Sequence, residues 1–69
     1  MAKPPRVTLR EILFEFVSVG KFVKVSALDP VTRTEVSIVG NPKVGTRALK
    51  AIAARKLEYV IAKRLVRNS

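Results

Sequence analysis

Gly20-Lys21 is the feature that most constrains the fold, because it separates two strand-like runs. The preceding run, residues 12–19 (ILFEFVSV), distributes its apolar residues alternately over two faces of a strand. The following run, residues 22–28 (FVKVSAL), also fits a short strand. A two-residue loop that begins with glycine is typical of a type II′ turn, since its first central position needs a positive φ. The sequence therefore predicts a β-hairpin.

One register of this hairpin brings apolar side chains together. If Val19 lies opposite Phe22, three further pairs share one face of the sheet: Ser18 with Val23, Phe16 with Val25, and Phe14 with Ala27. All of these residues except Ser18 are apolar, so the turn and the hydrophobic pattern agree. We expect this face, which Ile12 also joins, to form the core.

Residues 34–39 (TEVSIV) predict a third strand. The turn before it begins with Asp29-Pro30, which suits the first two positions of a type I turn. On the third strand Val36 and Ile38 would join the core face, near Val25 and Val23 respectively. Gly40-Asn41-Pro42 then ends the strand.

Residues 45–67 predict one long helix, with Thr46 as its N-cap. Its apolar stripe covers about a third of the circumference and consists of Leu49, Ala53, Leu57, Val60 and Ile61, with Ile52 at one margin. Lys63, Arg64 and Arg67 fall near the C-terminal end, where cations suit the helix dipole. The expected fold is α+β: a three-stranded antiparallel meander with one C-terminal helix packed on one face, in the order βββα.

The length and composition allow one domain. The chain has 69 residues, of which 48% are hydrophobic, so it is expected to fold despite its net charge of +9. We assign the domain to residues 9–67 and expect residues 1–8 (MAKPPRVT) to form a disordered basic arm, because adjacent prolines disfavour regular structure. The sequence has no cysteine and no apolar run of membrane-spanning length, and we expect a cytoplasmic protein.

The residue types argue against catalysis. The sequence contains neither His nor Cys, which removes the commonest general base and the usual partner for a serine nucleophile. Its carboxylates have structural explanations: Asp29 suits its turn, while Glu15 and Glu35 face outward with Lys24 between them, as in cross-strand charge pairing. We therefore expect no enzyme, no metal and no cofactor.

A resemblance to a known family covers most of the chain, from about Leu9 to Arg64. It rests on five segments, which are residues 13–16 (LFEF), 23–25 (VKV), 29–30 (DP), 35–40 (EVSIVG) and 55–60 (RKLEYV). These segments resemble a family of short, uncharacterised proteobacterial proteins, a domain of unknown function. The family pattern often has glycine in the turn after Asp-Pro, where this chain has Arg33. The resemblance implies a bacterial protein, but no activity and no site.

The charge of the predicted helix indicates a polyanion partner. From Arg47 to Arg67 there are seven basic residues and one acid, Glu58. Phosphates along the helix would meet cations, and an aromatic ring there could stack on an unpaired base. The candidate nucleic-acid or anion contacts are Lys43, Arg47, Lys50, Arg55, Lys56, Tyr59, Lys63 and Arg67. The first three surround the helix entrance, where free N–H groups attract anions. The alternative is a solvated face that only keeps a small protein soluble.

A second surface lies on the face of the sheet turned away from the helix. Its apolar residues are Leu13, Val17, Val19, Phe22, Leu28 and Val39. Such a patch indicates a protein partner or a homodimer, unless Leu9, Ile12 or the N-terminal arm folds over it. We therefore expect a small, basic, non-catalytic binding protein that contacts nucleic acid through its helix, with little sequence specificity. The alternative is a protein-interaction or accessory subunit that uses the apolar outer face. No membrane partner is expected.

Overall fold

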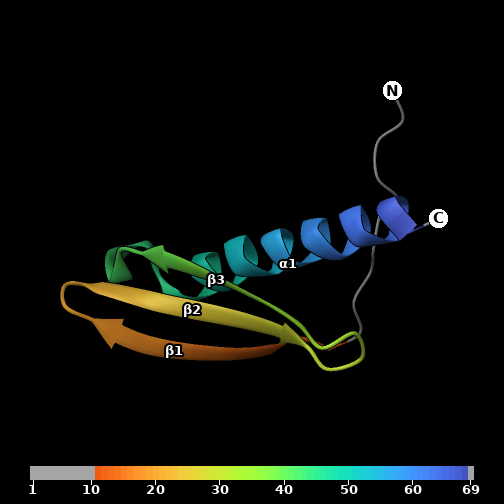
Figure 1. Cartoon of the computed structure of the whole chain (residues 1–69). Coiled ribbons are helices and arrows are strands. Elements are labelled where there is room, and N and C mark those ends of the chain that lie inside the picture. Colours follow the sequence, from red (N-terminus) through yellow and green to blue (C-terminus); the bar gives the residue numbers. More distant parts are fainter. Residues whose placement is uncertain (1–10, 69) are drawn as a thin grey trace.

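The computed structural model describes residues 11–68, so the arm expected over residues 1–8 lies outside them. Three antiparallel strands, β1 (Leu13–Val19), β2 (Phe22–Asp29) and β3 (Thr34–Gly40), form an open sheet in the order β1-β2-β3. A short 3₁₀ turn, η1 (Pro42–Val44), leads into one long helix, α1 (Thr46–Asn68). Figure 1 shows α1 lying along one face of the sheet. The predicted βββα fold is confirmed.

The first hairpin has the predicted register. Val19 lies opposite Phe22, and each pair expected on the core face is present, through to Phe14 opposite Ala27. Gly20 has a φ of 60°, whereas Lys21 has no positive φ, which is the combination that a type II′ turn requires. Glycine adopts this conformation without the steric cost of a Cβ atom.

The second turn corrects the register expected for β3. Asp29 pairs with Thr34, so only residues 30–33 form the loop. Val36 consequently lies opposite Ala27, and Ile38 opposite Val25, two positions along from the expected pairing. The face was predicted correctly, because a shift of two residues leaves every side chain on its original side of the sheet.

The Asp29 side chain holds this loop together. Its carboxylate accepts hydrogen bonds from the backbone N–H groups of Val31 (3.2 Å) and Thr32 (3.3 Å) and from the Thr32 hydroxyl (2.6 Å). Arg33 closes the loop by donating its N–H to the Asp29 carbonyl at 2.8 Å. The φ of Arg33 is 60°, a left-handed conformation that glycine adopts most easily. Glycine at this position would adopt the same conformation without the steric cost of a Cβ atom.

The core lies between α1 and two of the three strands. Its buried members are Val25, Ala27, Val36, Leu49, Ala53, Leu57 and Ile61, with Val60 half-buried beside them. α1 packs against β2 and β3 and makes few contacts with β1. A helix is about 10 Å across and strands lie about 4.8 Å apart, so one helix covers about two strands. Phe16 on β1, which we expected in the core, is therefore 37% exposed.

The start of α1 also differs from the prediction. The Gly45 carbonyl accepts the N–H of Leu49 at 3.0 Å, which places Gly45 in the N-cap position and makes Thr46 the first helical residue. Gly45 has a φ of 99°, and this conformation lets the chain turn directly from η1 into α1. A side-chain cap is present at η1 instead: Asn41 is its N-cap residue, and the Asn41 side chain accepts a hydrogen bond from the N–H of Lys43 at 2.9 Å.

Candidate nucleic-acid interface

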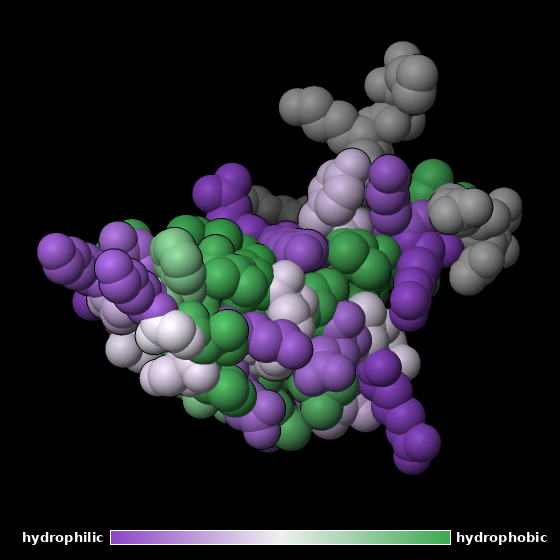
Figure 2. Space-filling view, turned by 60° about the vertical axis from the view of Figure 1, so that its left-hand side comes forward, coloured by the Kyte–Doolittle hydropathy of each residue, from purple (hydrophilic) through white to green (hydrophobic). Residues whose placement is uncertain are grey.

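The positive charge of the described chain is concentrated on α1. Residues 46–68 contain seven basic residues and one acidic residue, whereas residues 11–45 contain four of each. The sheet and its turns therefore have no net charge, and α1 has a net charge of +6. Figure 2 shows hydrophilic side chains interleaved with apolar ones over one face of the molecule. A polyanion would be attracted to the helix and not to the sheet.

Three of the candidate residues lie together on the side of α1 next to β3, which we call the β3 flank: Lys56, Tyr59 and Lys63. The Lys56 ammonium group donates to the Ser37 carbonyl of β3 at 2.8 Å, which fixes the side of the helix on which the flank lies. The Lys63 ammonium group lies 5.4 Å from the centre of the Tyr59 ring. Tyr59 is 56% exposed, so its ring can reach a ligand. Arg55 is exposed on α1 next to Lys56 in the sequence.

The residues at the helix entrance form a separate group. Lys43 lies in η1, and Arg47 and Lys50 lie in the first turns of α1, all three exposed. The Lys50 ammonium group is 5.3 Å from the centre of the Phe14 ring on β1, which places it on the opposite side of α1 from the β3 flank. The structure therefore divides the candidates between two sides of one helix. The side chain of Arg67 lies outside the described residues.

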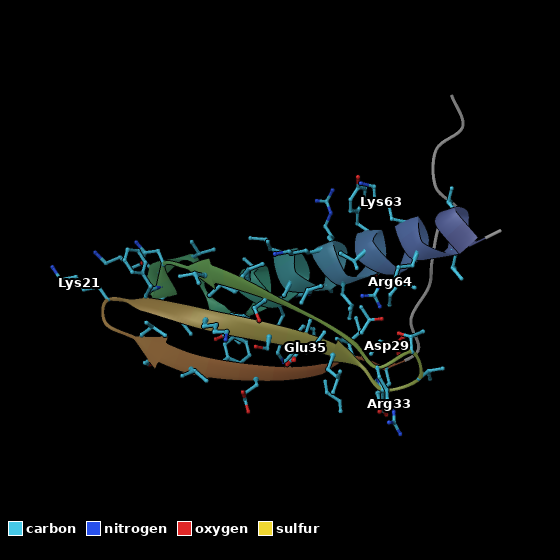
Figure 3. The ribbon with its side chains drawn as sticks, in the orientation of Figure 1. Lys21, Asp29, Arg33, Glu35, Lys63 and Arg64 are labelled. Atoms are coloured by element: carbon cyan, nitrogen blue, oxygen red, sulfur yellow. The ribbon has the colours of Figure 1, made fainter. Side chains whose placement is uncertain are left out.

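Arg64 is a basic residue of α1 with a structural contact. Its guanidinium donates to the Thr34 hydroxyl at 3.1 Å and so ties α1 to the start of β3. In Figure 3 Arg64 lies toward the turn that contains Asp29, whereas Lys63 points away from the sheet. Arg64 lies seven residues, or about two helical turns, after Leu57, so both side chains are on the side of α1 that faces the sheet. This spacing is the feature of the sequence from which the position of Arg64 could have been predicted.

The carboxyl group of Asp29 has a lowered pKa. The hydrogen bond from the Thr32 hydroxyl is the main cause and holds the pKa of Asp29 below its ordinary value of 3.8. The N–H groups of Val31 and Thr32 lower the pKa further, and burial opposes them. These partners all belong to the turn, so the shift reflects a structural role.

The outer face of the sheet is exposed and apolar, as predicted. Its exposed fractions are Leu13 48%, Val17 45%, Val19 53%, Phe22 54% and Val39 65%, while Leu28 is half-buried. Ile12 packs against the core and does not cover this face; Leu9 lies outside the described residues. A shallow open hollow on the same part of the sheet is lined in part by Glu15, Ser26 and Glu35.

The charges on the outer face are not paired as expected. Lys24 lies opposite Val17 and Val39, whereas Glu15 lies opposite Ser26 and Glu35 opposite Leu28. Lys24 is therefore diagonal to Glu15 but well removed from Glu35, and the expected arrangement of Lys24 between both carboxylates is wrong. The register shift of β3 is the reason, since it moves Glu35 along the sheet.

Among residues 11–68 no three His, Cys, Asp or Glu side chains gather in a way that could hold a metal ion. The one described helix is not apolar enough over a sufficient length to cross a membrane.

The fold and this surface define a class: a small α+β domain with an open sheet and a strongly basic helix. Residues 9–64 match the model of the DUF6898 family, a domain of unknown function. The chain belongs to this family, which confirms the resemblance to a domain of unknown function. No curated protein and no solved structure matched the chain.

Proposed function

We propose that this protein is a non-catalytic nucleic-acid-binding domain that contacts phosphates through α1. The supporting observation is the separation of charge: α1 has a net charge of +6, while residues 11–45 have none. A helix that served only solubility would not need to carry six of the nine net positive charges on one element. We place the protein in the cytoplasm, in keeping with a cysteine-free sequence.

The β3 flank is the part of α1 best suited to a nucleic-acid strand. Lys56 and Lys63 are two turns apart, about 10 Å along the helix axis, and Tyr59 lies between them. Ammonium groups at this spacing can each approach a phosphate, and binding releases the counterions that the phosphates held. The exposed Tyr59 ring can stack on an unpaired base, which favours a single strand over a duplex.

Low sequence specificity follows from the same residues. Lysine contacts a phosphate as a point charge, so this contact does not distinguish one base from another. Stacking on Tyr59 is also tolerant, since every base has a π face. Specificity for particular bases would need side chains that read base edges, a role distinct from the phosphate contacts and the stacking assigned to the β3 flank.

The test is a titration of a fluorescently labelled single-stranded oligonucleotide with the full chain, followed by anisotropy at several salt concentrations. We expect binding at low salt that weakens steeply as salt rises. Lys63→Glu should weaken binding about tenfold and make the slope of log K against log salt shallower by about 1 or more. Lys21→Glu is the matched control, because it makes the same charge change at the tip of the first hairpin, well away from Lys63 (Figure 3). An equal effect of the two variants, or no binding at low salt, would overturn the proposal.

The outer face supports a second candidate, a protein-interaction or accessory subunit. Five apolar side chains on this face are between 45% and 65% exposed, which is unusual for a monomer of this size. In that case Phe22→Glu would abolish binding to the protein partner while leaving oligonucleotide binding unchanged. Affinity capture with and without nuclease separates the candidates, because a partner that survives nuclease treatment is not held through nucleic acid.

A further inference from the structure

The strand β1 forms an edge of the sheet that the rest of the described chain leaves open. Six of its seven residues are exposed, and Phe14 is half-buried. The opposite edge of the sheet, β3, is partly covered. The Lys56 ammonium group donates a hydrogen bond to the Ser37 carbonyl of β3, and α1 packs against this strand. Proteins usually protect an edge strand with lysine, proline or a bulge. The sequence of β1, LFEFVSV, has neither lysine nor proline and pairs with β2 without a break.

The turn determines which backbone groups of β1 point outward. In the turn that Gly20 begins, the Val19 carbonyl accepts the N–H of Phe22, so this pair is hydrogen-bonded. Bonded and non-bonded pairs alternate along an antiparallel ladder. The N–H and C=O groups of Phe14, Phe16 and Ser18 therefore point away from β2, toward the open edge. The same alternation makes the Ser37 carbonyl point outward from β3, which agrees with its bond to Lys56.

We propose that β1 pairs in antiparallel fashion with β1 of a second copy of this chain, about a two-fold axis at Phe16. This register places Phe16 opposite Phe16 and Phe14 opposite Ser18. It pairs the outward N–H and C=O groups of all three residues on both copies. The two sheets then become one continuous sheet, and the 37% exposed Phe16 side chains meet across the seam.

Charge favours a second copy as the occupant and favours this register. Residues 11–45 have no net charge, so two sheets can approach edge to edge, whereas two helices of net charge +6 would repel. A two-fold axis at Glu15 would set two carboxylates directly opposite each other, which is destabilising. The axis at Phe16 sets each Glu15 opposite Val17. Both helices then lie on the same face of the joined sheet, but each packs over its own β2 and β3, so the two β1 strands separate them. The inference stands whether or not the helices bind nucleic acid.

The first test uses the unaltered chain. Light scattering after size exclusion should give twice the chain mass of 7.6 kDa. Amide hydrogen exchange measured by NMR on the same sample should show slow exchange for the N–H groups of Phe14, Phe16 and Ser18, which a monomer would leave open to water. A monomer at all concentrations, or fast exchange at these three amides in a dimer, would overturn the proposal.

The second test separates the edge from the outer face. Ser18→Pro removes an outward N–H without touching the bonds to β2, so the chain should fold and become monomeric. Ser18→Ala is the matched control, since it keeps the N–H and should stay dimeric. Circular dichroism verifies that both variants fold. Dimerisation that survives Ser18→Pro but is lost in Phe22→Glu would assign the contact to the outer face and overturn the edge pairing.

Discussion

Replacing Arg33 with glycine should stabilise the protein, and the reason lies in one backbone angle. Arg33 has a φ of 60°, and an L-residue with a side chain pays about 1–2 kcal/mol for this left-handed conformation. Glycine avoids that cost but loses about 0.5–1 kcal/mol through the greater freedom of its unfolded chain. The net gain in the free energy of unfolding is about 0.5–1 kcal/mol.

The surroundings of Arg33 give no reason for a compensating loss. Its side chain is exposed, and the hydrogen bond that closes the loop, from the Arg33 N–H to the Asp29 carbonyl at 2.8 Å, belongs to the backbone and survives the substitution. In a domain of this size the gain corresponds to a rise in melting temperature of about 2–8 °C.

Thermal and urea denaturation followed by circular dichroism measure this gain. Arg33→Ala is the control, because it removes the same charge and side chain but keeps the Cβ atom that makes a positive φ costly. The alanine variant should therefore match the unaltered chain within about 0.5 kcal/mol. If glycine and alanine change stability equally, the backbone angle is not the cause and the reasoning is refuted.

Two further predictions concern the core and the second turn. Leu57 is fully buried in the core, so Leu57→Ala should lower the free energy of unfolding by about 3 kcal/mol. Leu65→Ala is the control, because that side chain is 54% exposed, and it should lower the free energy of unfolding by less than about 1 kcal/mol. Similar losses for the two variants in urea denaturation would contradict the core assignment. The pKa of Asp29 is lowered by folding, so its charged form stabilises the native state above about pH 3.8, and this contribution disappears as the pH falls through the folded pKa. Asp29→Asn should therefore destabilise the protein near neutral pH and progressively less below pH 4; a stability difference independent of pH would contradict the role given to the carboxylate.

The sequence alone predicted the first hairpin and the buried side of the helix, because local rules determine the geometry of both. Gly20 allows only a few turn types, and the alternation on either side of it agrees with one register, so the first hairpin could be predicted pair by pair. The stripe from Leu49 to Ile61 likewise indicated which side of the helix meets the sheet. Membership of a family of unknown function adds no information on activity, so the candidate site rests on charge and exposure.

The register of β3, the exposure of Phe16 and the contacts of the lysines could not be predicted, because they depend on distances that the alternation of apolar and polar residues does not determine. The length of the second loop is set by Asp29, which accepts hydrogen bonds from three groups of the turn, and by the left-handed conformation of Arg33. For this reason the observed register of β3 differs by two residues from the predicted one. The exposure of Phe16 depends on how many strands one helix covers, which the pattern of a single strand cannot show. The division of the cations between two sides of α1 could be anticipated from helical spacing, but the contacts of Lys50 with Phe14 and of Lys56 with Ser37 could not.

Phosphate binding through α1 is tested most directly by NMR, with ¹⁵N-labelled full chain titrated with a single-stranded oligonucleotide at low salt. The account predicts that the amide signals around Lys56, Tyr59 and Lys63 shift in a saturable way and return toward their starting positions when salt is added. Shifts confined to the outer face of the sheet, or no shifts at low salt, would contradict it.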